Sequence, residues 1–239
     1  LILEDDIRLS DQTRQWLDTT LPLCRSDQHC AGVSLYTPRI NELVSGKPVI
    51  TRLMEAIPEN LVRQQLPCSW GAVYKAHHWR LFRAWMELRV HNTSRYGLPV
   101  AIGRMYGWQK SWKKFFTEIM LLLDWHLIYP NFKSQMSFAT NMVRTGVHIT
   151  SHDAEHTAHR YTVPLFKGSN ILPSQLKIST TILNAVYQPV ELISTTVTTK
   201  SIGHTMHVRS PCDNYDPYLH RSIIALSLTP TNQQATNQQ

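Results

Sequence analysis

The first part of the chain contains short apolar runs separated by polar segments, a pattern that predicts β-strands. Leu1-Ile2-Leu3 is apolar and ends in the acids Glu4-Asp5-Asp6, so we expect a buried strand whose carboxyl end presents these acids. Residues 31–36 predict a second strand, which Pro38 stops, and residues 70–74 predict a third. Because a domain rarely begins in the middle of its core and no initiator Met is present, we expect further strands upstream in a longer parent protein.

Two segments in the middle of the chain have helical periodicity. Bulky apolar residues recur about every 3.6 positions in the segment His77–His91. A second helix is predicted to begin at Ser111 as its N-cap, and its apolar residues follow an i, i+3, i+4 stripe over Trp112–Leu123. The turn at residues 129–131 is expected to end this helix. Helices and strands together predict an α/β fold.

The sequence changes in character after about residue 170. Stretches rich in Thr, Ser and β-branched residues favour strands, and residues 233–239 form a polar segment typical of disorder. We therefore expect a main portion at 1–168, a β-leaning or irregular C-terminal extension at 169–230, and a disordered tail at 231–239. The sequence contains no internal repeat.

Composition excludes two broad classes of protein. Hydrophobic residues make up 42% of the 239 residues, which is enough to form a core and argues against general disorder. The longest strongly apolar run, Ile119–Leu123, is far shorter than the ~18 residues that span a bilayer. Lys and Arg (24) outnumber Asp and Glu (17), and the net charge of +7 favours an anionic ligand such as nucleic acid, phosphate groups or a membrane surface.

The cysteines give a weak indication of compartment. Cys24, Cys30, Cys68 and Cys212 form no CxxC pair and no zinc-ribbon spacing. Cys24 and Cys30 could close a short loop in an oxidising compartment, and buried free thiols are the alternative. The triplet at residues 92–94 (Asn-Thr-Ser) is an N-glycosylation sequon. These features lean towards a lumenal protein.

The acidic run Glu4-Asp5-Asp6 is the strongest candidate for chemistry. Clustered carboxylates repel one another, so folding them together is costly unless a cation bridges them. Mg²⁺ and Mn²⁺ prefer oxygen ligands and are commonly held by one or two carboxylates together with the phosphates of a substrate. The alternative is an acidic turn that caps a helix starting near Asp11.

Two further segments offer a surface for a ligand. Trp70 presents a flat apolar face on which a sugar can stack, and Gly71 allows close approach of the backbone, although a core strand containing a glycine is the alternative. Lys110, Lys113 and Lys114 lie at the start of the second helix, where backbone N–H groups already favour anions.

Other titratable residues extend this set. Glu118 lies off the apolar stripe of the second helix and is our candidate general base; a solvated Lys114–Glu118 pair at i, i+4 is the alternative. His148, His152 and His156 are spaced by four, so on a helix they would share one face and could bind zinc. A His-rich surface loop is the alternative.

Taken together and in this order, four segments give the chain a family resemblance. It resembles GT-A-fold, nucleotide-sugar-dependent glycosyltransferases, and most of all fungal and plant proteins of the family-two-like type. The matching segments cover roughly residues 1 to 150, and they are LILEDDIRL, PCSWGAVYKAHHW, SWKKFFTEIMLLLDWHLIYPNF and SFATNMVRTGVHI. The order of the set is far more specific than any one segment.

The resemblance implies a role for each candidate residue. The run at residues 4–6 stands where the family has its DxD-type motif, with Glu4 in place of the usual aspartate, and Asp6 would bind Mn²⁺ or Mg²⁺ and through it the diphosphate. The other roles implied are contact with the donor (Trp70, Gly71, Ala72, Lys113, Lys114), catalytic carboxylate (Glu118) and further metal ligands (Glu4, Asp5, His148). Glu118 would act as the base if the enzyme inverts, and this assignment loses its basis if the enzyme retains.

The resemblance also implies a fold, a compartment and substrates. We expect a GT-A-like mixed sheet flanked by helices, in which the nucleotide-binding half that normally precedes the DxD motif is missing. The donor would be a UDP- or GDP-sugar, and the acceptor a glycan, glycoprotein or glycolipid, with no nucleic acid. The parent would be a Golgi type II membrane protein in the secretory pathway, anchored by a segment outside this chain.

Two functions from other classes remain as alternatives. A zinc-dependent hydrolase would use His148, His152 and His156. A nucleic-acid-binding module would use the basic helices, with the residues Arg80, Arg83, Arg89, Lys113 and Lys114, and its binding would depend steeply on salt. Neither alternative explains the acidic run, the Trp-Gly-Ala segment and the lysine-rich helix start together.

Overall fold

The computed structural model describes residues 1–41, 57–91, 105, 107, 111–142, 161–168 and 176–190, together with the backbone of two later strands. The helices and strands used below are β1 (Ile7–Leu9), α1 (Thr13–Ser26), β2 (Cys30–Ser34), β3 (Leu61–Gln64), β4 (Ala72–Tyr74), α3 (Ala76–His91), α4 (Lys113–Leu122), β5 (His126–Pro130), η2 (Lys133–Gln135), β6 (Ala139–Asn141), β7 (Ile178–Leu183), β8 (Thr195–Thr198) and β9 (Thr205–Val208). The predicted α/β class is confirmed.

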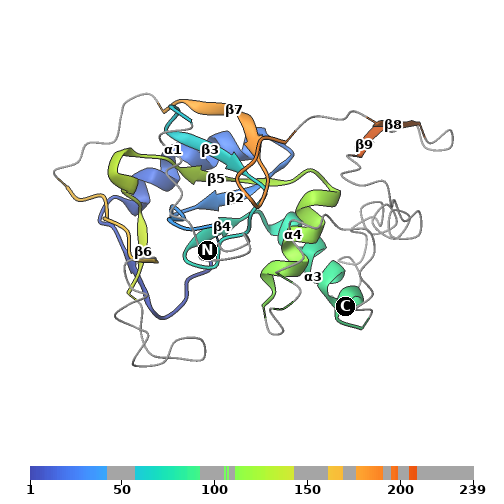
Figure 1. Ribbon diagram of the computed structural model, residues 1–239, viewed down its shortest axis with the longest axis horizontal. Helices are drawn as coiled ribbons and strands as arrows, with labels where there is room; N and C mark the ends of the chain where they lie inside the picture. Colours follow the sequence, from blue (N-terminus) through green and yellow to red (C-terminus); the bar gives the residue numbers. More distant parts are fainter. Residues whose placement is uncertain are drawn as a thin grey trace, which may run out of the picture.

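The centre of the molecule is a mixed five-stranded sheet with the order β4-β2-β5-β3-β7 (Figure 1). The pairs β2–β5 and β3–β7 are parallel, and the pairs β2–β4 and β3–β5 are antiparallel. A separate antiparallel ribbon joins β1 to β6. The central strands β2 and β5 are buried at every position, as expected for strands covered on both faces.

Helices cover the sheet at two places. α1 packs along β2, and Trp16 of α1 is fully buried, stacked on Phe138 at 4.5 Å between ring centroids. α3 and α4 lie side by side at the end of the molecule where β4 ends (Figure 1). Their contact is aromatic, with Phe82 of α3 and Phe116 of α4 at 4.6 Å. Within the described residues, no helix is long and apolar enough to cross a membrane.

The sheet corrects the expectation for the first residues. Ile2 makes an antiparallel bridge to Ala72, so this segment lies beside β4 at the edge of the sheet. Leu1 and Leu3 are 62% and 42% exposed, and the prediction of a buried strand here is therefore wrong. Apolar character does not itself bury a strand, because a strand at an edge is covered only where another element packs on it.

The second predicted helix is shorter than expected. It ends at Leu122, and the next residues do not form a continuation to the turn at 129–131 but enter β5. Asp124 has a left-handed backbone (φ 56°), which stops the helix and turns the chain back into the sheet. The predicted N-cap Ser111 lies one residue before the cap position, although its Oγ still accepts a hydrogen bond from the Lys113 N–H (3.3 Å).

The central sheet extends past the boundary expected at residue 168. β7 comes from the predicted C-terminal extension and pairs with β3 along its length. β8 and β9 form a separate two-stranded ribbon, which agrees with the β-leaning character predicted there. The predicted tail at 231–239 lies outside the described residues.

Candidate active site

The acidic run forms a turn between the sheet edge and the β1–β6 ribbon. The Ile7 N–H donates to the Glu4 carbonyl (3.3 Å), and the Met142 N–H donates to the Asp6 carbonyl (2.8 Å). The pairing of β1 with β6 places Asn141 opposite Ile7. The turn is therefore fixed at both ends by backbone hydrogen bonds.

Asp6 has an incompletely satisfied carboxylate. Its Oδ2 accepts a hydrogen bond from Asn141 Nδ2 (2.9 Å), which holds the side chain in one orientation. Its Oδ1 is buried and has no hydrogen-bond partner among the described residues. Leaving a buried carboxylate oxygen unpaired is costly, and a divalent cation would compensate for it. The residues present therefore fit a metal at this oxygen.

The other two acids do not complete a protein-built metal cage. Asp5 is exposed, and Glu4 turns towards the loop before β4, where it accepts a hydrogen bond from the Ser69 hydroxyl. Burial raises the pKa of Glu4, while the Ser69 hydrogen bond and the charge of Lys113 oppose that rise. No group of three metal-binding side chains occurs in the described part of the chain. A cation at Asp6 would take its remaining ligands from a substrate or from water.

Trp70 and Lys113 meet at the start of α4. The Nζ of Lys113 lies 5.4 Å from the centroid of the Trp70 ring, a cation–π contact. The Trp70 ring also makes edge-to-face contacts with Tyr36 (4.9 Å) and Tyr161 (5.1 Å). Lys114, by contrast, places its Nζ over the ring of its neighbour Phe115. The structure thus brings Trp70 and Lys113 together and leaves Lys114 apart.

Gly71 and Ala72 have structural roles at the edge of the sheet. Gly71 has φ +100°, which side-chain-bearing residues rarely adopt, and a Cβ there would lie 3.2 Å from the Cβ of Ala139. Its carbonyl accepts from the Leu35 N–H (2.8 Å). Ala72 is fully buried and exchanges two backbone hydrogen bonds with Ile2. Of the three residues expected at the donor sugar, only Trp70 faces open space.

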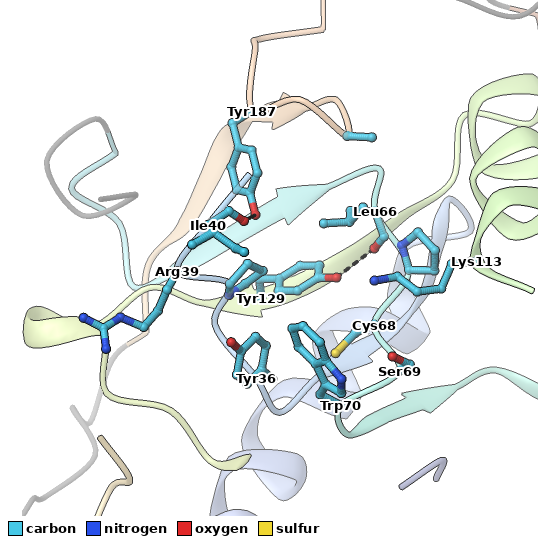
Figure 2. A pocket seen from close by; sticks show the side chains of 13 residues that line it. Tyr36, Arg39, Ile40, Leu66, Cys68, Ser69, Trp70, Lys113, Tyr129 and Tyr187 are labelled. Atoms are coloured by element: carbon cyan, nitrogen blue, oxygen red, sulfur yellow. Dashed lines mark hydrogen bonds between the residues drawn. The ribbon is translucent and has the colours of Figure 1, made fainter. Parts of the chain in front are cut away.

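That space is a hollow above one face of the sheet, which we call the aromatic hollow (Figure 2). It has a volume of about 420 Å³, counted with the part that opens to solvent. The described residues that line it are Tyr36, Pro38, Arg39, Ile40, Leu66, Pro67, Cys68, Ser69, Trp70, Lys113, Tyr129, Ala185 and Tyr187. Ser69 and Lys113 connect the aromatic hollow with Glu4 of the acidic turn.

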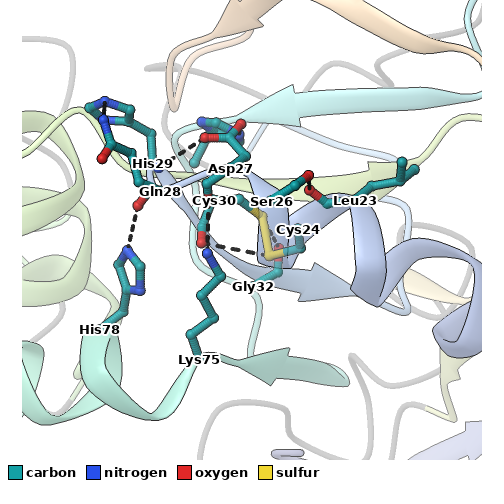
Figure 3. The surroundings of a disulfide bond; sticks show 11 residues. Leu23, Cys24, Ser26, Asp27, Gln28, His29, Cys30, Gly32, Lys75 and His78 are labelled. Atoms are coloured by element: carbon teal, nitrogen blue, oxygen red, sulfur yellow. Dashed lines mark hydrogen bonds and ion pairs between the residues drawn. A yellow bond between two sulfur atoms is a disulfide. The ribbon is translucent and has the colours of Figure 1, made fainter.

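Cys68 lines the aromatic hollow and is the free cysteine of the described part of the chain. Burial raises the pKa of its thiol to about 11, so the thiol stays protonated at neutral pH. Because the thiolate is the nucleophilic form, Cys68 is not suited to nucleophilic catalysis here. Cys24 and Cys30 form a disulfide with a Cα–Cα distance of 5.3 Å (Figure 3), which settles the two alternatives for this pair.

Glu118, our candidate base, lies in the interface between α3 and α4. Its side chain is 1% exposed. Oε2 accepts from Arg89 Nε (2.9 Å) and from Trp85 Nε1 (3.2 Å), and Oε1 accepts from Arg89 Nη2 (3.1 Å). A carboxylate paired on both oxygens and closed from solvent has the surroundings of a structural ion pair. The geometry thus favours neither the base nor the solvated pair that we considered.

The described residues bear on only one of the two alternative functions, the nucleic-acid-binding module. His148, His152 and His156 lie outside the described residues. Of the basic residues proposed for nucleic-acid binding, Arg89 is buried against Glu118, and Arg83 lies 3.9 Å from Glu87 on the exposed face of α3. These residues do not share one surface.

Asn141 and Ser69 were not among the site residues predicted from the sequence. Asn141 lies in the SFATN segment, and Ser69 precedes Trp70. An Asn or a Ser alone does not indicate a site in a sequence, because its role depends on the residue that it contacts in the fold. Strand pairing brings Asn141 to Asp6, and the loop before β4 brings Ser69 to Glu4.

Comparison with known proteins does not assign the chain to a family. No protein-family model matches the chain, and no curated protein matches it either. The functional argument therefore comes from the geometry of the site and from the resemblance of its motifs.

Proposed function

We propose that the protein is a metal-dependent glycosyltransferase that transfers a sugar from a UDP- or GDP-sugar to a hydroxyl group of a glycan, glycoprotein or glycolipid. The observation that carries this proposal is the Oδ1 of Asp6, a buried carboxylate oxygen without a partner among the described residues. Mixed-sheet architecture and the order of the motifs support it.

Asp6 would hold Mn²⁺ or Mg²⁺, and Asn141 keeps the Asp6 carboxylate oriented. When bound, such a cation neutralises the diphosphate and makes it a better leaving group. Lys113 lies close enough to Glu4 to interact with it and supplies a second positive charge beside the turn. Glu118 enters the proposal as a structural residue, because Arg89 occupies both of its oxygens.

The compartment follows from the same proposal. Disulfides persist in oxidising compartments, and Cys24–Cys30 is therefore in keeping with a place in the secretory pathway, such as the Golgi lumen. The sequon at 92–94 agrees with this location.

Calorimetric titration tests the proposal. Pyrophosphate, UDP-glucose and GDP-glucose are titrated into the chain with and without Mn²⁺; pyrophosphate is included because the acidic turn would contact the diphosphate rather than the nucleoside. We expect binding that requires Mn²⁺ and that weakens at least about tenfold in Asp6→Asn, which loses the charge but keeps the shape of the side chain.

The matched control is Asp18→Asn. Asp18 is an exposed acid on α1 that lies 3.6 Å from Arg14, so its substitution makes the same change in charge away from the turn. Its affinity should equal that of the unmodified chain. Binding without Mn²⁺ dependence, or Asp6→Asn with full affinity, would contradict the proposal.

A further inference from the structure

Asn141 occupies one of the two carboxylate oxygens of Asp6. The Asn141 side chain is buried, with the residue 5% exposed, and its Nδ2 donates to Asp6 Oδ2 (2.9 Å). A carboxylate can only accept hydrogen bonds, so the amide must present its NH₂ group to Asp6 and not its oxygen. Oδ1, which is buried and has no partner among the described residues, is thus the oxygen left for a cation.

The backbone fixes the position of this pair. Asn141 lies in β6 opposite Ile7 of β1, and the neighbouring Met142 N–H donates to the Asp6 carbonyl (2.8 Å). The Thr162 hydroxyl also donates to the Asn141 carbonyl (3.0 Å). Strand pairing and a later segment of the chain therefore hold the amide and the carboxylate at hydrogen-bond distance.

The neighbouring acids do not replace the oxygen that Asn141 occupies. Glu4 accepts a hydrogen bond from Ser69 and interacts with the charge of Lys113, and Asp5 is exposed. The acidic turn thus offers a divalent cation one open carboxylate oxygen in a fixed position. A cation held by so few protein oxygens depends on the phosphates of a substrate for further ligands.

An aspartate at position 141 would change this balance. It has nearly the same shape as Asn, and it would place a carboxylate oxygen where Nδ2 now lies, 2.9 Å from Asp6 Oδ2. Two carboxylates at this distance repel each other, and a cation bound between them relieves the repulsion. Such a site would retain a cation without phosphate, which the amide of Asn141 does not favour.

We propose that Asn141 is a positioning residue that leaves Asp6 a single open oxygen and thereby makes the protein bind Mn²⁺ or Mg²⁺ only together with a diphosphate. The ligand recognised at the acidic turn is the complex of cation and diphosphate, and the free cation binds weakly. This inference rests on the proposed function for the presence of a cation at Asp6, but neither the nucleoside nor the sugar takes part in it.

Equilibrium dialysis of Mn²⁺ tests this inference, alone and with pyrophosphate, at equal concentrations of free Mn²⁺. In the unmodified chain, pyrophosphate should tighten the binding of Mn²⁺ at least about tenfold. In Asn141→Asp, Mn²⁺ alone should bind at least about tenfold more tightly than it binds to the unmodified chain, and pyrophosphate should add less.

The matched control is Asn184→Asp, which makes the same change from amide to acid away from the acidic turn. Asn184 uses its side-chain oxygen to accept from the N–H groups of Val186 (2.9 Å) and Gln188 (3.0 Å), and aspartate keeps this oxygen. Its binding of Mn²⁺ should equal that of the unmodified chain.

A second variant tests the position of the carboxylate. Asp6→Asn combined with Asn141→Asp exchanges the two side chains and keeps their total charge and their ability to pair. The carboxylate then comes from β6, so Mn²⁺ with pyrophosphate should bind as weakly as in Asp6→Asn alone. Urea unfolding checks that each variant is folded, and Mn²⁺ alone should raise the unfolding midpoint of Asn141→Asp.

Three outcomes would overturn the inference: equally tight binding of Mn²⁺ to the unmodified chain with and without pyrophosphate, unchanged binding of Mn²⁺ alone in Asn141→Asp, or full binding in the exchanged variant. These outcomes do not depend on the donor. Titration of UDP-glucose and GDP-glucose decides the proposed function, whereas the response of Asn141→Asp to Mn²⁺ alone decides the role of Asn141.

Discussion

His78 is a buried titratable residue whose neutral form the fold prefers. It is 1% exposed, lies edge-to-face on Trp125 at 4.3 Å, and its Nε2 lies 3.2 Å from the Gln28 carbonyl (Figure 3). Burial lowers the pKa of His78 to about 3, and the nearby charges of His77 and Lys75 act in the same direction. Gln28 belongs to the loop that the Cys24–Cys30 disulfide closes, so His78 ties α3 to that loop.

The lowered pKa of His78 predicts a loss of stability in mild acid. Between about pH 6.5 and pH 3 the unfolded chain binds a proton that the folded chain does not, so the free energy of unfolding falls as the pH falls. From pH 8 to pH 5 this loss amounts to about 2 kcal/mol. Urea unfolding at several pH values measures it.

His78→Phe keeps a ring against Trp125 and cannot take up the proton, so most of this pH dependence should disappear. His29→Gln removes a half-buried histidine of the same loop and should retain it. The Asp27 carboxylate does not add to this change in stability between pH 8 and pH 5. The hydrogen bond from His126 lowers the pKa of Asp27, so the stability that this carboxylate contributes is lost only in stronger acid. An unchanged slope in His78→Phe would rule out this origin.

At the level of elements, a buried ion pair joins α3 to α4 beneath their aromatic contacts. Arg89 and Glu118 are 5% and 1% exposed and form two hydrogen bonds with each other. The guanidinium also lies 5.8 Å from the centroid of the Trp85 ring. Such a pair stabilises the fold little more than apolar side chains of similar size would. Removing only one partner, however, leaves the other as an unpaired buried charge, which is strongly destabilising.

Removing only Arg89 should therefore destabilise the protein strongly. Arg89→Met leaves Glu118 charged and buried, and we expect a loss of about 3–5 kcal/mol in the free energy of unfolding. The double variant Arg89→Met, Glu118→Leu should recover most of that loss. Arg83→Met, whose partner Glu87 is exposed, is the control and should leave stability nearly unchanged.

The double variant also decides the role of Glu118. A stable double variant that retains sugar transfer would establish the ion pair as structural. A stable but inactive one would return Glu118 to the role of base that the family resemblance implies.

At the scale of the whole molecule, the sheet joins segments that lie far apart in the chain. β7 completes the sheet beside β3, where Arg63 Nε donates to the Ser179 carbonyl (2.9 Å) and the Gln65 N–H donates to the Leu183 carbonyl (2.8 Å). The loop after β7 also supplies Tyr187 to the aromatic hollow. β7 and the loop that follows it are therefore part of the framework of the candidate site.

Two truncations test how much the framework depends on β7. A chain that ends at residue 168 loses β7 and exposes the edge of β3, so its unfolding midpoint in urea should fall well below that of the full chain. A chain that ends at residue 190 keeps β7 and loses the β8–β9 ribbon and the rest of the C-terminal region, so its midpoint should stay close to that of the full chain. Equal midpoints for the two truncations would mean that β7 adds nothing to the stability of the sheet.

Local patterns in the sequence were sufficient for several elements. The periodicity of His77–His91 predicted α3, and the apolar run at 31–36 predicted β2. Such local patterns suffice because side chains return to the same face every 3.6 residues in a helix and every 2 residues in a strand, whatever surrounds the element. The same reasoning failed at β5. Its residues continue the apolar character of α4, so the sequence pattern alone does not separate strand from helix. The left-handed backbone of Asp124 ends the helix, and hydrogen bonding to β2 on one side and β3 on the other makes the next residues a strand.

The sequence by itself determined the α/β class and selected the acidic run, Trp70 and Lys113 as residues with chemistry to offer. Tertiary structure alone decided what each of them contacts. Asp6 and Asn141 are 135 positions apart, and no local pattern connects them, because the pairing of β1 with β6 depends on the burial of distant segments. For the same reason only the packing of α3 on α4 could place Glu118 against Arg89. Residue types and periodicity are properties of the chain, whereas partners and burial are properties of its fold.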